Sequence, residues 1–290
     1  MITDEQRKIS ESYIGGSNIA AVLGLSNFKT QLQLWSELTG LLPREDISGK
    51  MQVRLGNKME AVVAEVFEED TGKKLHRVSE TFRNPKYPYL VGHIDRRVVG
   101  ERAIVEIKAV SAWSKELWKD GNAPQEYLIQ LMWYMGLTNT PMGYLVALIG
   151  NQELAIVPVN FDKEVYEQMV AKAVKFWEDF VIPKVMPTTI TKDDGSTLYQ
   201  LFPISDPNKD IVLTDETNIV IEQINSMTQD RIALDDQIEQ RKNELKAILG
   251  DNESGRTGNW RVTWKTQNKK EYVVKASSTR VLRYSQIKEG

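Results

Sequence analysis

Asp95, Glu106 and Lys108 have the residue types and the spacing that metal-assisted hydrolysis of a phosphodiester would need. Glu106 and Lys108 lie two apart in an expected strand, so both side chains point to the same face. Asp95 ends an earlier expected strand, and a turn can bring it beside them. Two carboxylates repel each other unless a cation joins them. A divalent metal would join them and lower the pKa of a bound water, while a nearby ammonium positions the nucleophile.

The apolar surroundings of Glu106 and Lys108 strengthen this interpretation, because alternating charges alone are common on surface strands. The segment IVEIKAV is apolar around both residues and places Ile107 on the opposite, buried face. Buried unpaired charge is costly, so these side chains need partners. The chain has two histidines and no cysteine, so oxygen atoms would hold a metal, which indicates Mg²⁺ or Mn²⁺. His93 is expected to pack near the site rather than to bind the metal.

Glu60 and Gln130 are further candidates for this site. Glu60 lies beside the apolar stripe of an expected helix over residues 51–70 and could reach the metal or a water bound to it. A solvent-facing helix glutamate is the simpler interpretation. Gln130 shares a helix face with Tyr127 and Tyr134 in an otherwise apolar setting, so its amide needs a partner. A phosphate, the attacking water or a backbone group would each supply one.

Ser17, Trp113 and Lys115 are candidates for contacts with nucleic acid. Ser17 follows two glycines at the start of a short helix, where free N–H groups favour an anion such as a terminal 5′-phosphate. On local grounds an ordinary serine helix cap is the simpler interpretation. Trp113 and Trp118 flank Lys115 and could stack on unpaired bases, although packing in the core is the expected role of both tryptophans. Tyr127 is a further possible contact with DNA.

The composition excludes several classes of protein. A hydrophobic fraction of 41% and a charged fraction of 27% over 290 residues are typical of a globular chain with an ordinary core. No stretch of about 18 uncharged apolar residues could span a membrane, and the first residues lack the pattern of a signal peptide. The absence of cysteine fits a reducing cytosol. A net charge of −3 counts mildly against a nucleic-acid binder, whose charge is often positive.

Periodicity predicts an α/β (α+β) domain over residues 1–205, followed by a helical arm with a β-hairpin appendage over residues 206–290. Prolines at 183, 187, 203 and 207 predict a linker between the two parts. Expected helices cover residues 17–24, 30–39, 51–70, 125–136 and 162–181, and expected strands cover 79–83, 89–94, 97–99, 103–108, 143–149 and 153–159.

The arm is expected to serve oligomerisation or partner binding. Along one helix of roughly 35 residues, about 50 Å long, apolar residues recur at alternating steps of three and four. This is the pattern of a coiled-coil seam, here interrupted by two arginines. The seam residues are Ile224, Met227, Arg231, Leu234, Ile238, Arg241, Leu245 and Ile248. Expected strands over 260–265 and 271–275 close the chain. The last forty residues carry nine Lys/Arg against four Asp/Glu, a positive balance that could bind phosphate and that equally fits a solvated surface.

Five segments in this order resemble the phage-type exonucleases of the lambda-exonuclease-like, YqaJ-type viral recombinase family, within the PD-(D/E)xK nuclease superfamily. They are IGGSNIAAVLGLS, LGNKMEAVVAEVF, GHID, VEIKAV and EYLIQLMWYMG, and the resemblance covers roughly the first 190 residues. It implies a central mixed β-sheet flanked by helices, with a restriction-endonuclease-like core. It also implies a Mg²⁺-dependent 5′→3′ exonuclease of phage or prophage recombination, which digests duplex DNA from an end in the cytoplasm of a bacterial host and leaves a 3′ single-stranded overhang.

The resemblance also implies a role for each residue of the site. Asp95, Glu106 and the backbone carbonyl of Ile107 would bind the metal, with two ions in the site and Mn²⁺ as a substitute for Mg²⁺. Glu60 would support the metal site, and Lys108 would position the nucleophilic water. Each of these roles is carried over by position within the matching segments.

The remaining family residues concern the DNA. Gln130 would contact water or phosphate, and Ser17 resembles the family's 5′-phosphate-binding serine. The family places an arginine upstream of this serine, where Arg7 is the candidate here at a longer spacing. Ile94 replaces the superfamily's proline before Asp95, at a position that varies in such folds. Related enzymes form ring-shaped trimers and work beside a single-strand annealing protein. The resemblance therefore implies that this protein acts on DNA ends, forms a homotrimer and works with such a partner. No membrane is expected as a partner.

Two other functions fit the same residues. A RecB-like or structure-specific endonuclease would use the same site and would cut closed circles. A non-catalytic DNA-binding or inhibitor protein would keep the fold, although the complete set of Asp95, Glu106, Lys108 and Gln130 argues against it.

Overall fold

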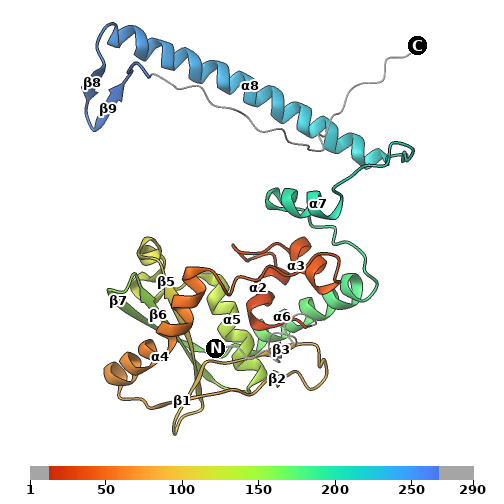
Figure 1. The fold of residues 1–290 in the computed structure, drawn as a ribbon, viewed down its shortest axis with the longest axis vertical. Helices are drawn as coiled ribbons and strands as arrows, with labels where there is room; N and C mark the ends of the chain where they lie inside the picture. The colour runs from red at the N-terminus through yellow and green to blue at the C-terminus, as the bar shows by residue number, and fades with distance from the viewer. Residues whose placement is uncertain (1–12, 268–290) are drawn as a thin grey trace. The chain divides into compact units, whose positions relative to one another are not determined.

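The computed structural model describes residues 13–267, which form two compact units (Figure 1). One unit ends at Phe202 and the other begins at Pro203. The first contains a five-stranded sheet with flanking helices, and the second contains one long helix and a small hairpin. Among the residues that the structure describes, no helix is both long enough and apolar enough to cross a membrane.

The central sheet is mixed, as predicted. Its strand order is β1–β4–β5–β6–β7, and the pairing of β5 with β6 is parallel while the other neighbouring strands run antiparallel. Helix α5 (Gln125–Leu137) lies in the crossover that the parallel pair requires. The strands are β1 (Leu75–Arg77), β4 (Arg96–Val98), β5 (Ala103–Val110), β6 (Met142–Ile149) and β7 (Glu153–Asn160).

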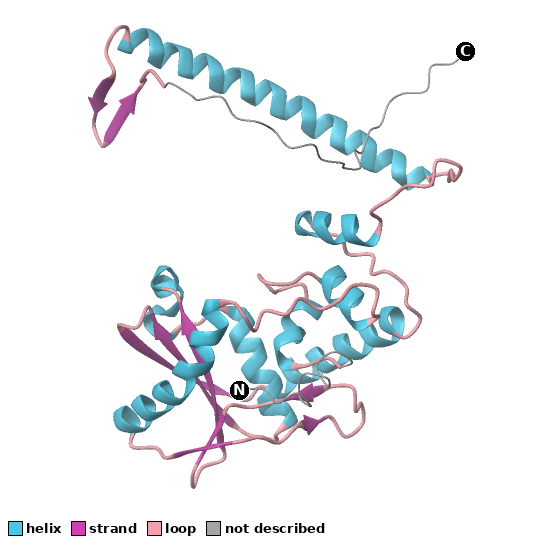
Figure 2. Cartoon of the chain, in the orientation of Figure 1, coloured by secondary structure: helices cyan, strands magenta, loops and turns pink. Residues whose placement is uncertain are grey.

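Helices cover both faces of this sheet (Figure 2). On one face, α4 (Met51–Thr71) packs Val63 and Phe67 against β5 and β6. On the other face, the core joins the sheet to α5, α2 (Gly16–Val22) and α6 (Lys163–Phe176). Strand β6 lies between these layers and reads YLVALI, the continuous apolar run that a strand buried on both faces requires.

Two predicted strands are shorter in the structure than expected. Of residues 79–83 only β2 (Phe82–Arg83) is a strand, and of residues 89–94 only β3 (Val91–Gly92). The two pair with each other as a separate ribbon. Prolines between them remove backbone donors, which limits the pairing. Strand β1 has no counterpart among the predicted strands, because three residues at the edge of a sheet leave almost no periodic signal.

The stretch around the prolines, predicted as a linker, is partly helical, and the boundary between the two units falls within it. It contains η3 (Lys192–Asp194) and α7 (Gly195–Leu201). The buried carboxylate of Asp194 accepts hydrogen bonds from the backbone N–H and the hydroxyl of Thr191 at 2.6 and 2.8 Å. It also accepts a hydrogen bond from the hydroxyl of Thr30 at 2.5 Å. Thr30 directly precedes α3 (Gln31–Leu38). The bond with Thr30 joins the segment to the start of α3, and proline spacing gives no sign of it.

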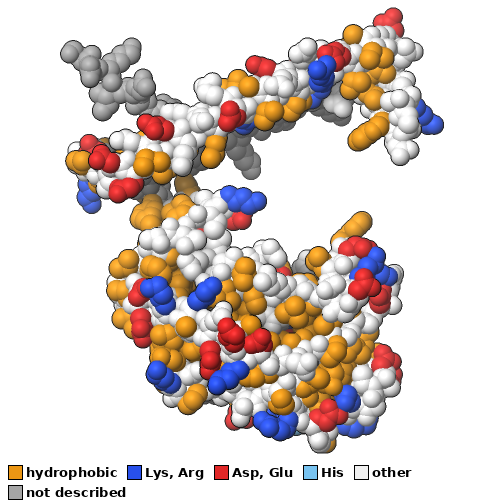
Figure 3. Space-filling model, turned by 180° about the vertical axis from the view of Figure 1, so that it is seen from behind, with side chains coloured by type: hydrophobic (Ala, Val, Ile, Leu, Met, Phe, Trp, Pro, Cys, Tyr) orange, Lys and Arg blue, Asp and Glu red, His pale blue; other side chains and the backbone are white. Residues whose placement is uncertain are grey.

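The second unit contains α8 (Asp215–Leu249), a helix of 35 residues. Hydrophobic and charged side chains alternate along it (Figure 3). A hairpin follows, in which β8 (Ser254–Thr257) pairs antiparallel with β9 (Trp260–Thr263). Strand β9 corresponds to the strand expected over 260–265, but its partner precedes it in the chain. The strand expected over 271–275 lies outside the described residues.

Candidate active site

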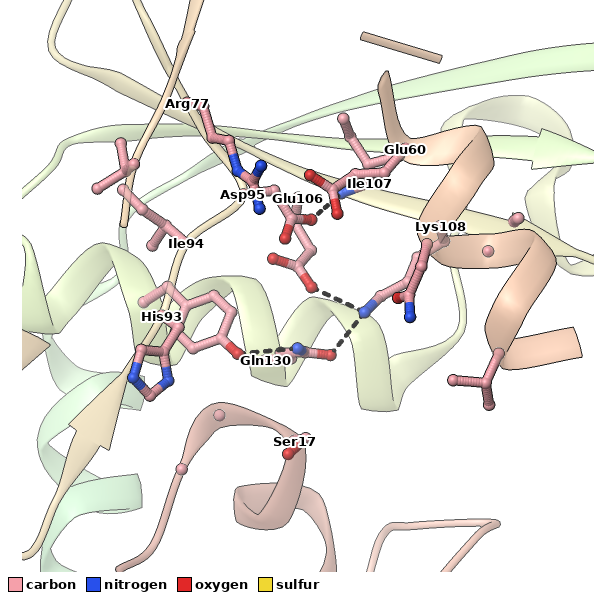
Figure 4. Close-up of a pocket in the computed structure, with 18 of the residues that line it drawn as sticks. Ser17, Glu60, Arg77, His93, Ile94, Asp95, Glu106, Ile107, Lys108 and Gln130 are labelled. Carbon is pink, nitrogen blue, oxygen red and sulfur yellow. Dashed lines mark hydrogen bonds and ion pairs between the residues drawn. The ribbon is translucent and has the colours of Figure 1, made fainter. Parts of the chain in front are cut away.

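Strand β5 presents Glu106 and Lys108 on one face, as the two-residue period of a strand requires (Figure 4). The loop between β3 and β4 brings Asp95 beside them. The Oδ2 atom of Asp95 accepts a hydrogen bond from the backbone N–H of Ile107 at 2.9 Å. Glu106 and Ile107 are buried, at 4% and 9% exposure. The charged groups therefore meet within the sheet rather than on its surface.

Lys108 is the centre of a chain of hydrogen bonds. Its Nζ atom donates to Oε1 of Glu106 at 2.7 Å and to Oε1 of Gln130 at 2.9 Å. The amide of Gln130 then donates to the hydroxyl of Tyr134 at 3.0 Å. The ammonium also lies 5.1 Å from the ring centroid of Tyr127, within the range of a cation–π contact. Gln130, Tyr134 and Tyr127 all lie on α5, so the sheet and this helix build the site together.

Burial changes the proton affinity of the charged groups. Burial, followed by the charge of Asp95, raises the pKa of Glu106 to about 8. Burial also raises the pKa of Asp95, against the opposing effect of Lys108. Burial alone would lower the pKa of Lys108, but the two carboxylates outweigh it and raise that pKa. The carboxylates therefore bind cations, protons included, more readily than exposed carboxylates do.

The pair of Asp95 and Glu106 fits a hard divalent cation. Both are oxygen donors, Glu106 buried and Asp95 half-buried, and the backbone N–H of Ile107 binds the carboxylate of Asp95. Within residues 13–267, no group of three or more His, Cys, Asp or Glu side chains is arranged to hold a metal. The protein would thus supply two carboxylates and a backbone carbonyl, with water and substrate phosphate completing the coordination, as is usual for Mg²⁺.

Glu60 lines the same pocket and is engaged by an arginine. The Nη1 atom of Arg96 donates to Oε1 of Glu60 at 2.5 Å and to the backbone carbonyl of Asp95 at 2.8 Å. The guanidinium thus joins α4 to the loop that carries Asp95. As a smaller effect, Glu60 raises the pKa of both Asp95 and Glu106. The simpler of the two expectations, that Glu60 only faces solvent, is therefore wrong.

A pocket of about 490 Å³ connects Asp95 and Lys108 with Ser17 (Figure 4). Ser17 is an exposed residue of α2, but it is not the helix cap, because the cap position is Gly15 and no side chain caps this helix. The ordinary capping interpretation of Ser17 is therefore wrong. Arg44 and Arg77 line the same pocket. The candidate Arg7 lies outside the described residues.

Two glycines hold the ring of Tyr134 in place. A Cβ atom at Gly16 would lie 2.2 Å from Cε1 of this ring, and one at Gly92 would lie 2.9 Å from its Cδ1. Neither distance is compatible with a side chain. The glycines therefore allow α2 and β3 to approach Tyr134 closely, and the tyrosine hydroxyl reaches Gln130. The glycine before Ser17 thus positions a ring at the site.

The aromatic candidates for DNA contact divide into buried and exposed residues. Trp118 is 5% exposed and stacks on Tyr127 with ring centroids 6.0 Å apart, so packing in the core is confirmed for this tryptophan. Trp113 is 96% exposed, so the same expectation was wrong there. It is the second residue of the 3₁₀ segment η1 (Ala112–Gly121). Lys115 in this segment pairs with Glu153 at 2.6 Å.

His93 packs at the edge of the pocket. Its Nε2 atom lies 3.0 Å from the hydroxyl of Thr81, and burial, followed by the charge of Arg83, lowers its pKa. A histidine with this environment is predominantly neutral at pH 7. Packing near the site is what its position in the sequence predicts.

Sequence reasoning missed three arginines at or beside the pocket: Arg44 and Arg77 line it, and Arg96 binds Glu60, which lines it. Arg96 directly follows Asp95, so its place beside a predicted acidic pair was a usable signal. Arg77 lies on β1, which the sequence does not indicate, and Arg44 lies in a loop with no periodic pattern. Their positions become visible only when the chain is folded.

Comparison with known proteins identifies the family of this site. The YqaJ-like viral recombinase domain matches residues 6–141. The protein YqaJ of Bacillus subtilis (strain 168) is 30% identical over 259 residues, which are 87% of this chain and 80% of that protein. The chain belongs to the YqaJ-like viral recombinase family. The prediction of this family from five segments is confirmed.

Solved structures of an exonuclease are similar in fold to this YqaJ-like recombinase. An alkaline exonuclease from Laribacter hongkongensis is similar with a TM-score of 0.55 and 17% identity, over 63% of this chain and 94% of that chain. The same exonuclease in complex with dAMP is similar with a TM-score of 0.55 and 18% identity, over the same shares. These matches confirm the predicted exonuclease-like fold, a mixed sheet with flanking helices.

The raised pKa of Glu106 predicts how the stability of the metal-free protein depends on pH. In the unfolded chain this carboxyl titrates near its ordinary value of 4.5, whereas its folded pKa is about 8. The folded state holds more protons between these values, so its extra stability is complete below 4.5 and is lost as the pH rises through 8. Urea unfolding in EDTA from pH 5.5 to 8.5 should show this loss. Glu106→Gln should flatten the dependence, and an unchanged slope would contradict the assignment.

The clash at Gly16 predicts an unequal effect of two neighbouring substitutions. Gly16→Ala should lower the free energy of unfolding by about 1–3 kcal/mol, the usual range for overpacking, because its Cβ atom meets Tyr134. Gly15→Ala is the matched control, since its Cβ atom would lie 3.9 Å from Val91. Chemical denaturation of both variants measures the difference. Equal stability of the two would show that the tyrosine ring is not confined.

Proposed function

We propose that this protein is a metal-dependent exonuclease that digests double-stranded DNA in the 5′→3′ direction and leaves a 3′ single-stranded overhang. The observation that carries the proposal is the position of Lys108, which is hydrogen-bonded to both Glu106 and Gln130 beside the half-buried Asp95. Family membership and the exonuclease-like fold support it. The site offers acidic ligands, a cation and an amide on one wall of a pocket.

Asp95, Glu106 and the carbonyl of Ile107 would hold Mg²⁺, or Mn²⁺ in its place. The proposed arrangement has two ions in the site. When bound, the metal supplies charge neutralisation at the phosphate and lowers the pKa of a coordinated water. The residues themselves supply the rigid geometry. The bond from Ile107 N–H fixes one carboxylate oxygen of Asp95 and leaves the other available. Glu60, held by Arg96, would support the ion from α4.

Lys108 and Gln130 would position the attacking water. The ammonium already lies between a carboxylate and an amide oxygen, so its donors point into the region where the water would be. Its raised pKa keeps it charged at neutral pH, as an electrostatic role requires. Gln130 is itself fixed by Tyr134, which reduces the rearrangement needed when substrate binds.

The DNA end would enter the pocket toward Ser17. The Ser17 hydroxyl is exposed in the same pocket and would bind the terminal 5′-phosphate. Tyr127, the exposed Trp113 and Lys115 would contact the DNA near the catalytic centre. The solved complex of the Laribacter hongkongensis exonuclease with dAMP supports a nucleotide as the ligand of this fold. A homotrimer around the duplex and a single-strand annealing protein as partner complete the proposal.

Linear and closed circular duplex DNA, each with Mg²⁺ and with EDTA, distinguish the possible activities. We expect loss of the linear form alone, and only with Mg²⁺. Cutting of closed circles would instead indicate an endonuclease. Binding without cleavage under all conditions would indicate a non-catalytic DNA-binding protein.

Asp95→Ala and Lys108→Ala should each reduce cleavage by at least about 10²–10³-fold, the range for losing one preorganised electrostatic contact. Lys163→Ala removes a lysine that is 78% exposed and is the matched control for Lys108→Ala. Initial rates on linear duplex, together with circular dichroism to verify folding, measure the effect. Wild-type rates in either site variant would contradict the assignment.

Ser17→Ala should reduce the preference for 5′-phosphorylated over 5′-hydroxyl ends by about tenfold, as expected for losing one hydrogen bond to a charged group. Ser196→Ala removes another exposed serine hydroxyl and should leave the preference unchanged. Rates on duplexes that differ only at the 5′ end measure it. The same preference in wild type and Ser17→Ala would exclude Ser17 from end recognition.

A further inference from the structure

Helix α8 carries an uncovered apolar seam. The six apolar seam residues at positions 224, 227, 234, 238, 245 and 248 are between 37% and 79% exposed. They recur at steps of three and four, the spacing with which one helix packs against another. Arg231 and Arg241 occupy the two remaining seam positions. Large apolar side chains in a row on a helix indicate a partner for this face.

The seam has the same order of residue types from either end. Between Ile224 and Ile248 it runs as two apolar residues, an arginine, two apolar residues, an arginine and two apolar residues, and the steps between them are also symmetrical. Two antiparallel copies therefore match apolar with apolar and arginine with arginine throughout. The matched residues are Ile224 with Ile248, Met227 with Leu245, Arg231 with Arg241, and Leu234 with Ile238.

We propose that α8 pairs with the α8 of a second copy of this chain as an antiparallel coiled coil. The twofold axis would pass between Leu234 and Ile238 of each helix, as the symmetry of a homodimer requires. Each matched pair then occurs twice, which gives apolar contacts at the centre and at both ends. This pairing concerns the second unit alone and does not depend on the proposed nuclease activity. Where the proposed homotrimer forms, each α8 pair would join chains of two different trimers, because a twofold axis relates two copies only.

Charges beside the seam favour the antiparallel direction. The positions that directly precede seam positions 231 and 245 are acidic, Asp230 and Glu244. In an antiparallel pair, each couple of Arg231 and Arg241 lies beside Asp230 of one helix and Glu244 of the other. Within one chain, Arg241 already lies 2.8 Å from Glu244, and Arg231 lies 3.6 Å from Asp235. Each arginine layer is therefore neutralised on both copies alike.

A parallel pair would distribute the same charges unevenly. Two copies of Arg231 would face each other among two copies each of Asp230 and Asp235, an excess of acid. Two copies of Arg241 would meet among two copies each of Lys242 and Glu244, an excess of base. Like charges at such flanking positions oppose pairing and select the partner's direction.

Single cysteines can test the direction of pairing, because the chain has no natural cysteine. Gln237 and Gln223 are exposed and hold the same position relative to the seam. In the antiparallel pair Gln237 lies next to Gln237 of the second copy, near the axis, whereas Gln223 lies far from its counterpart. Oxidation of full-length Gln237→Cys should therefore give a disulfide-linked dimer, and the matched control Gln223→Cys should remain unlinked.

Either of two results would overturn the proposal. Equal cross-linking of both variants would indicate a parallel or unspecific contact. No cross-linking of Gln237→Cys at concentrations where the wild type is associated would show that the axis is elsewhere.

A second pair of variants measures the contribution of the seam to assembly. Ile238→Asp places a charge at the centre of the seam and should lower the mass of the full chain in light scattering. Ile232→Asp makes the same change at a residue that is 44% exposed and lies off the seam, and it should keep the wild-type mass. Equal masses for both variants, or a monomeric wild type, would contradict pairing through α8.

Discussion

The mutual repulsion of Asp95 and Glu106 is the constraint around which the first unit is organised. Glu106 is buried and Asp95 is half-buried, and the burial of Glu106 together with the proximity of Asp95 raises the pKa of Glu106 to about 8. Such a pair is stable only if cations and donors surround it. Lys108 and the N–H of Ile107 supply part of this compensation from β5 itself. The strand order places β5 at the centre of the sheet, between β4 and β6.

The compensation extends outward to both helical layers. Gln130 on α5 shares the ammonium of Lys108, and on the opposite side Glu60 on α4 binds Arg96. Helix α5 thus contributes Gln130 and the hydroxyl of Tyr134, and α4 contributes Glu60, to a polar network beside the apolar core. A network of this kind fixes one arrangement of the layers, because displacing either helix would break a hydrogen bond to Lys108 or Arg96.

The sequence predicted the long elements and the central residues well, and the edges poorly. The period of β5 places Glu106, Ile107 and Lys108 on their faces because it is a local property of any strand. The three-residue β1 and the bonds of Asp194 depend on contacts far apart in the chain, so no local pattern reveals them. Trp113 shows the same limit, since it and Trp118 belong to one 3₁₀ segment and have the same hydrophobicity, yet Trp113 is exposed and Trp118 is buried.

The confined ring of Tyr134 has a geometric consequence for the pocket. Gly16, directly before Ser17, and Gly92 both lie against this ring, and Ser17 lines the same pocket as Glu106 and Lys108. The tyrosine hydroxyl accepts a hydrogen bond from Gln130, whose amide oxygen accepts one from Lys108. The ring therefore links the start of α2 to Lys108, so a displacement of α2 would disturb both the position of Ser17 and the hydrogen bonds of the lysine.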